Sequence, residues 1–107
     1  MDFSHREIIT TILEKGLSLH DKGINNWVFT KIQCLTAIEE IQQNNIAILG
    51  GDTYLNGQIN PNGDSWSVDR QVGEGDQEYF ERSINAAIKF VSNPIYAKYS
   101  FLLVPKQ

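Results

Sequence analysis

The centre of the chain reads Ile-Ala-Ile-Leu-Gly-Gly-Asp-Thr-Tyr from residue 46 to residue 54. Its first four residues form a continuous apolar run, which is too short for a helix and typical of a strand covered on both faces. Gly50 and Gly51 predict that this strand bulges or passes close to another backbone, because neither residue carries a side chain. We expect the Asp52 carboxylate to accept turn N–H groups or to meet a partner's cation. The stretch is therefore predicted to be the central strand of a sheet, ending at the turn signal of residues 56–57.

Two helices are predicted before this strand. A Thr-x-x-Gln capping box at residues 30–33 predicts a helix that begins there and ends at the Asn pair 44–45. A Ser-x-x-Glu box at residues 4–7 predicts another helix over residues 5–15, with an extension to residue 21 as the alternative. Gly16 is expected to close that helix in the left-handed conformation.

Strand and helix signals resume after the turn residues that fill positions 56–65. Trp66 and Val68 alternate with polar residues and predict a half-exposed antiparallel strand. Asp76 is suited to be the N-cap of a third helix. The aromatic and β-branched residues of 96–104 predict the last strand.

The expected order of elements is helix, helix, strand, strand, helix, strand (α-α-β-β-α-β). Three helices packed on a small, mostly antiparallel sheet make an α+β fold. The length of 107 residues predicts a single domain over residues 1–107. The pattern lacks the alternating βαβ units of nucleotide-binding folds.

Composition and charge narrow the classes of function. Nine Lys and Arg residues against thirteen Asp and Glu residues give a net charge of −4, which disfavours nucleic acid or an anionic membrane as partner and favours a basic protein. A lone cysteine, Cys34, and the absence of a signal-peptide pattern predict a cytoplasmic protein. No apolar run approaches the ~20 residues of a membrane span.

The chain shows no assembled catalytic or metal motif. Its two histidines, His5 and His20, lack the spacing of metal ligands, so we expect no metal, no cofactor and no catalytic residue. Asn60, Asn62 and Asp64 resemble the start of a calcium loop, but the later glycine and glutamate of that loop are missing.

Two alternatives to a binding protein stay open. One is a small hydrolase in which folding brings Asp52 close to His20 or Cys34. The other is a small-ligand or regulatory module, which would need an apolar pocket with convergent polar groups.

The charge of the chain is concentrated in residues 64–81. This segment carries six acidic side chains against Arg70 alone, a local net charge of −5, with Trp66 and Tyr79 interleaved. A charge run of this kind is either a solvated face or a docking surface for a basic protein, which complementary charge attracts and aromatic side chains anchor.

Several of these features together resemble a family of bacterial immunity proteins from polymorphic toxin systems, the family numbered forty. The resemblance is carried by the stretch 46–54 entered from a capped helix, by Trp66 after an Asn-rich turn, and by Tyr79 with Ser83, and it covers roughly residues 24–92. Thr53 stands where the family more usually has an aliphatic β-branched residue.

The resemblance implies a cytosolic protein that binds and neutralises the toxin domain encoded beside it, as in contact-dependent growth inhibition, without catalysis. A one-to-one complex is expected, and the oligomeric state stays open because strand 96–104 can be central or an edge. A basic toxin, for which a nuclease is one class, would present a cationic surface to the carboxylates.

The candidate contact residues are the acidic and aromatic side chains Asp52, Tyr54, Asp64, Trp66, Asp69, Glu74 and Glu78. For Trp66 a position in the core is an equal alternative, because its alternation partner Val68 is apolar. The residues that carry the resemblance can likewise specify the fold while the toxin is bound elsewhere.

Overall fold

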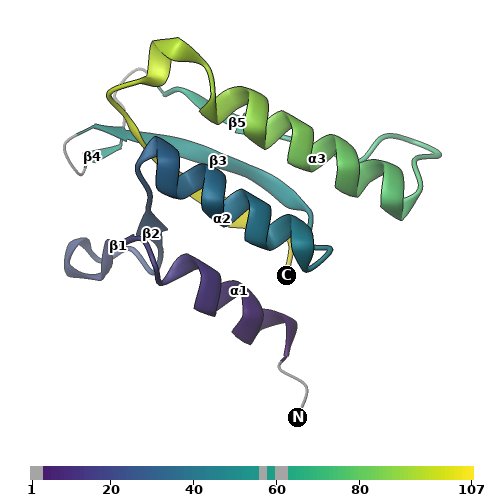
Figure 1. Cartoon of the computed structure of the whole chain (residues 1–107), viewed down its shortest axis with the longest axis horizontal. Coiled ribbons are helices and arrows are strands. Elements are labelled where there is room, and N and C mark those ends of the chain that lie inside the picture. Colours follow the sequence, from purple (N-terminus) through teal and green to yellow (C-terminus); the bar gives the residue numbers. More distant parts are fainter. Residues whose placement is uncertain (1–3, 56–57, 60–62) are drawn as a thin grey trace.

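The computed structural model describes residues 4–55, 58–59 and 63–107 and has an α+β fold, as predicted (Figure 1). Its three helices are α1 (His5–Leu13), α2 (Lys31–Gln43) and α3 (Asp76–Val91). Its strands are β1 (Leu17–Ser18), β2 (Trp27–Val28), β3 (Ile48–Leu55), β4 (Gln58–Ile59), β5 (Ser65–Ser67) and β6 (Ser100–Pro105), with 3-10 turns η1 (His20–Lys22) and η2 (Pro94–Tyr96).

The predicted central strand is confirmed, and it pairs on both sides. All partners of β3 are antiparallel: β4 and β5 follow one another along one edge, and β6 occupies the other. Phe29 extends the sheet beyond β6, because Phe29 and Phe101 each donate a backbone hydrogen bond of 2.8 Å to the other. The strand begins at Ile48 instead of Ile46, since the first two residues of the apolar run lead into it from α2.

The predicted bulge at the two glycines is also present. The pairing of β3 with β6 shifts between Ile48, opposite Pro105, and Gly50, opposite Val104, so Leu49 is the extra residue. A Cβ atom on Gly50 would overlap the Trp66 carbonyl oxygen, and one on Gly51 would overlap the Leu102 carbonyl oxygen and the Trp66 ring. Both glycines are therefore required by close approach of neighbouring strands.

The starts of α1 and α2 lie where the capping boxes predict them, but the conformation expected after α1 differs. Thr30 caps α2 in the predicted box, and Ser4 accepts the Glu7 N–H at the start of α1. The expected left-handed Gly16 is wrong: a Cβ there would lie 2.7 Å from the Val28 carbonyl oxygen, so the glycine permits close packing instead.

Two further boundaries differ from the prediction. The N-cap of α3 is Gly75, and Asp76 is the first helical residue. The last strand begins at Ser100 because residues 94–96 form η2. The short strands β1, β2 and β4 were not predicted, since two residues are too few for a periodic pattern.

The helices cover one face of the sheet (Figure 1). The main core lies between them and the sheet, and Phe101 and Leu103 of β6 are fully buried in it. On the opposite face the segment from β1 to β2 covers Tyr54 and Leu102, with Leu19 and Val28 packed against them. Within the described residues, none of α1, α2 and α3 packs on that face.

Candidate functional site

The uncovered face of the sheet contains a hollow between β5 and β6. Gly50 is paired with Ser67 on one side and Val104 on the other, and Asp52 is paired with Ser65. Because side chains alternate along a strand, these residues point away from the helices that receive Trp66 and Leu103. The hollow measures about 340 Å³, and its lining comprises Leu49, Gly50, Gly51, Asp52, Ser65, Trp66, Ser67 and Val104.

Asp52 gives this hollow an acidic wall. Its side chain is half-buried, and within the described part of the chain the carboxylate has no hydrogen bond or ion pair, including the expected bonds from turn N–H groups. Ser65 and Ser67 are exposed, and no other described side chain engages their hydroxyl groups. Burial raises the pKa of Tyr54 beside them, and the charge of Asp52 raises it further.

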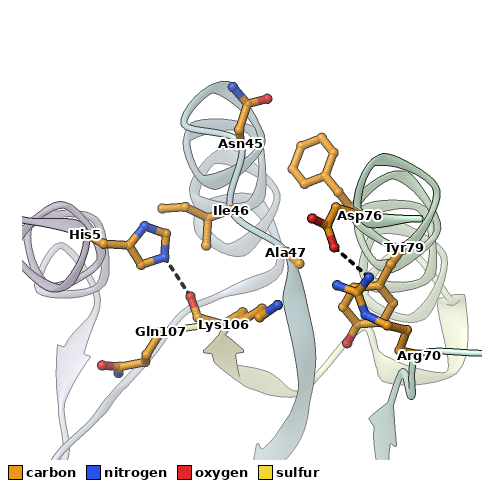
Figure 2. A pocket seen from close by; sticks show the side chains of 10 residues that line it. His5, Asn45, Ile46, Ala47, Arg70, Asp76, Tyr79, Lys106 and Gln107 are labelled. Carbon is orange, nitrogen blue, oxygen red and sulfur yellow. Dashed lines mark hydrogen bonds and ion pairs between the residues drawn. The ribbon is translucent and has the colours of Figure 1, made fainter. Parts of the chain in front are cut away.

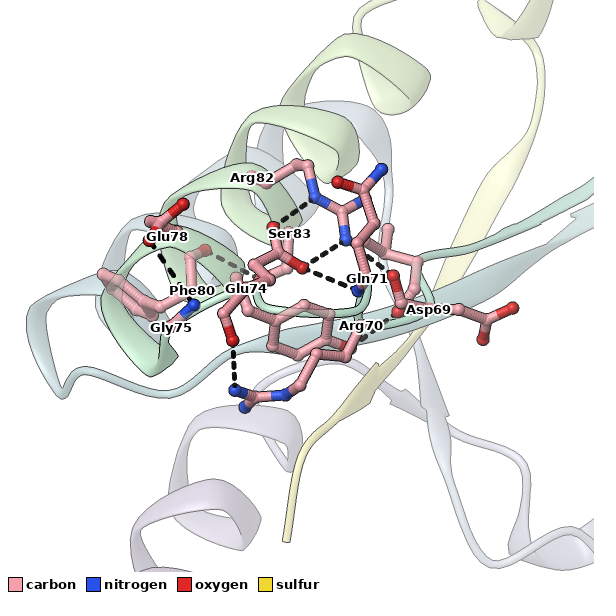
Figure 3. Close-up of polar contacts among 11 residues, drawn as sticks. Asp69, Arg70, Gln71, Glu74, Gly75, Glu78, Phe80, Arg82 and Ser83 are labelled. Carbon is pink, nitrogen blue, oxygen red and sulfur yellow. Dashed lines mark hydrogen bonds and ion pairs between the residues drawn. The ribbon is translucent and has the colours of Figure 1, made fainter.

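Two arginines, Arg70 within the acidic segment 64–81 and Arg82 directly after it, bind part of its negative charge (Figure 3). The guanidinium of Arg82 binds the Glu74 carboxylate twice, with Nε to Oε2 and Nη2 to Oε1 both at 2.7 Å. Arg70 binds Asp76 through a 2.7 Å contact from Nη1 to Oδ1. The sequence count missed the first pair because Arg82 lies one residue beyond the segment.

Glu74 organises the loop between β5 and α3. Its side chain is 7% exposed, and its Oε1 also accepts the Gln71 N–H at 3.0 Å. The hydrogen bonds from Arg82, followed by the one from Gln71, lower the pKa of Glu74 from 4.5 to about 2. Glu74 is therefore engaged within the molecule.

Replacing Glu74 by glutamine is expected to remove a pH-dependent part of the stability. The carboxylate has a lower pKa in the folded chain than in the unfolded chain, so its contribution is complete above about pH 4.5 and disappears as the pH falls toward 2. The Tm of the wild type should fall more steeply than that of E74Q over this interval in thermal unfolding monitored by circular dichroism. The exposed Glu39→Gln is the control, and parallel curves for wild type and E74Q would contradict the assignment.

Tyr79 and Ser83 of α3 are buried and bind the sheet. The Tyr79 hydroxyl donates to the Val68 carbonyl oxygen at 2.6 Å, just after β5. Ser83 Oγ accepts the Ile48 N–H at 3.0 Å, at the start of β3, and donates to the Phe80 carbonyl oxygen at 2.8 Å. Both side chains therefore fix the position of α3 on the sheet.

Trp66 belongs to the packing between β5 and α3. Its half-buried ring stacks on Phe90 with ring centroids 4.5 Å apart and lies over Gly51. The residues that carry the family resemblance therefore join β3, β5 and α3.

The seven candidate contact residues differ in their exposure and in the contacts that they make within the molecule. Asp69 and Glu78 are exposed, and Glu78 Oε1 accepts the Gly75 N–H at 3.4 Å. Asp64 is half-buried, and its carbonyl oxygen accepts a 2.7 Å bond from the Thr53 hydroxyl. Asp52 lines the hollow, whereas Tyr54, Trp66 and Glu74 are engaged in packing or internal bonds. Reasoning from sequence missed Leu49 and Val104 as walls of the hollow.

The residues of the hydrolase alternative do not meet in the described part of the chain. Cys34 is fully buried in α2, and burial raises its pKa to about 12, so the thiol stays protonated at neutral pH. His20 binds Ser18 Oγ through Nδ1 and Asn25 Oδ1 through Nε2, the latter at 2.7 Å. No described histidine contacts Asp52 or Cys34.

A second hollow, of about 490 Å³, bears on the small-ligand alternative (Figure 2). It lies where α1, the start of α3 and the C-terminal residues meet, over Ile46 and Ala47. Four of its lining residues already bind each other in pairs: His5 Nε2 lies 2.9 Å from the Lys106 carbonyl oxygen, and Arg70 binds Asp76. Few convergent polar groups are left there for a ligand.

The described residues hold no cluster of three or more His, Cys, Asp or Glu side chains placed to bind a metal ion. Among the helices of that part of the chain, none is long and apolar enough to span a bilayer.

Comparison with known proteins identifies the family. The family model of Immunity protein 40 matches residues 18–105, which extends the resemblance seen in residues 24–92 in both directions. No curated protein and no solved structure gave a match. The matched range begins at the second residue of β1 and includes β2 to β6 together with α2 and α3. The chain belongs to the Immunity protein 40 family.

Proposed function

We propose that this chain binds the toxin domain encoded beside its own gene and neutralises it in the cytoplasm by occupying its active or substrate-binding surface in a one-to-one complex. The observation that carries the proposal is membership of the Immunity protein 40 family over residues 18–105. The single domain acts by binding and transforms no substrate.

The charge of the surface supports a basic toxin. The chain has a net charge of −4, and the exposed or half-exposed carboxylates of Asp52, Asp69 and Glu78 are the contacts we favour. Asp64 is a further candidate at the end of the loop before β5. A nuclease fits this description, because it needs a cationic surface for phosphate groups that carboxylates can occupy in their place.

The candidate residues that are engaged within the molecule are proposed to hold the contact surface in its shape. Tyr54 lies on the same sheet face as Asp52 and packs against the β1–β2 segment, Trp66 supports β5, and Glu74 holds the loop that carries Asp69. A preorganised surface loses less conformational entropy on binding, so these side chains favour a tight complex without touching the toxin.

Co-expression tests the proposal. Cells that produce the C-terminal domain of the adjacent toxin gene are expected to survive only when this chain is produced with it, because every toxin molecule is then occupied. A toxin domain of unrelated sequence is the control and should still kill. Death of the co-expressing cells, with both proteins present and folded, would contradict the proposed function.

A further inference from the structure

We infer that the hollow beside Asp52 binds the side chain of an arginine presented by the toxin domain. The inference rests on the proposed function for the identity of the partner, and on the chemistry of the hollow for the nature of the group that enters it.

The polar lining of the hollow consists of acceptors for a cation. Asp52 supplies a half-buried carboxylate, and Ser65 opposite it on β5 and Ser67 next along that strand supply hydroxyl oxygens. None of the three side chains has a hydrogen-bond partner among the described residues. A planar guanidinium has five N–H donors and binds a carboxylate through two of them, which leaves others for the hydroxyl oxygens.

Asp52 differs in this respect from Glu74 and Asp76, whose carboxylates are bound by arginines of the chain. Glu74 is bound twice by Arg82, and Asp76 is bound by Arg70 although its side chain is 97% exposed. Asp52 has no such cation in the described part of the molecule, yet it is less exposed than a surface carboxylate. A partly buried charge gains most from an incoming cation, because water screens the pair less than at a fully exposed site.

The apolar lining suits the stem of a long side chain. Leu49 is 37% exposed and Val104 is 39% exposed, and both line the hollow. The bulge brings Leu49 to this position, since the extra residue changes the alternation of side chains along β3. Methylene groups pack on such walls while the charged head reaches the polar groups, and arginine loses less hydration than lysine when it does so.

The backbone leaves room for that stem and keeps the walls in place. Gly50, which faces this side of the sheet between Ser67 and Val104, adds no side chain to the hollow of about 340 Å³. β3 is paired with β5 on one side and β6 on the other, so the three walls belong to one hydrogen-bonded sheet. The hollow therefore exists before the partner arrives, which lowers the entropy cost of binding.

A blocked arginine, N-acetyl-arginine methylamide, tests the hollow without the toxin. In amide NMR spectra of the full chain at millimolar ligand, we expect shifts confined to Gly50, Gly51, Ser65 and Ser67. The matched citrulline compound, which has the same shape without the charge, should leave them unmoved. Asp52→Asn should abolish the arginine effect, whereas Asp69→Asn should retain it. Shifts elsewhere, no shifts, or shifts that survive Asp52→Asn would overturn the inference.

Binding of the cognate toxin domain tests the same point in the complex. Asp52→Asn is expected to weaken the complex about tenfold or more, whereas Glu39→Gln, at an exposed position outside the candidate contacts, should leave its affinity unchanged. Val104→Ser, which changes an apolar wall without altering charge, should also weaken it. Equal affinities for wild type and Asp52→Asn would rule out the arginine contact even if the toxin binds. If the toxin does not bind at all, the proposed function fails. The arginine titration then still shows whether the hollow binds an arginine side chain.

Discussion

Replacing Gly51 by alanine is expected to lower the free energy of unfolding by about 3 kcal/mol. The new Cβ would overlap the Leu102 carbonyl oxygen and would lie 2.6 Å from Cζ3 of Trp66. The carbonyl oxygen belongs to β6 and the indole ring is stacked on Phe90 of α3, so neither can move without loss of packing or pairing. Urea unfolding measures the change.

A double-mutant cycle separates the two causes of that loss. Trp66→Phe shortens the ring that the new methyl group meets, so Gly51→Ala should cost less in this background than in the wild type. Gly50→Ala should cost the same in both backgrounds, because its Cβ would overlap the Trp66 carbonyl oxygen, which the ring change leaves in place. Equal effects of Gly51→Ala in the two backgrounds would contradict the contact between Gly51 and the indole.

Replacing Ser83 by alanine is expected to cost about 1–3 kcal/mol. The side chain is fully buried, and its loss leaves the Ile48 N–H at the start of β3 without an acceptor. A second effect should appear in hydrogen exchange, where the Ile48 amide loses more protection than the change in global stability accounts for.

Ser67→Ala is the matched control for this change. The Ser67 hydroxyl is exposed on β5, and its removal should alter stability by less than about 0.5 kcal/mol. Equal stabilities for Ser83→Ala and Ser67→Ala would show that the bond to Ile48 contributes nothing.

The parts of the fold that depend on residues close together in the sequence could be predicted from the sequence. The capping box at Thr30 sets the start of α2, and the apolar run ending at Gly50 gives the central strand with its bulge. The start of β6 was wrong: the strand was expected from Tyr96, whose aromatic side chain is typical of strands, but the Asn93 side chain accepts the Ile95 N–H and initiates a 3-10 turn over residues 94–96.

The candidate site was harder to predict, because it depends on contacts between residues far apart in the chain. The acidic segment follows from a count of charges, but Arg82, which binds Glu74 across eight positions, lies outside it. Asp52 was a candidate from the motif alone. Its surroundings depend on the pairing of β3 with β5 and β6, which places Val104 and Ser67 on either side of Gly50. No local pattern contains that information.

The most direct test of neutralisation by binding is a titration of the purified toxin domain with this chain, with the toxin's own activity as the readout. The account predicts that activity falls linearly and reaches zero at one equivalent, and that the mixture elutes as a single complex of one copy of each protein. Full toxin activity in the presence of excess folded chain would contradict it.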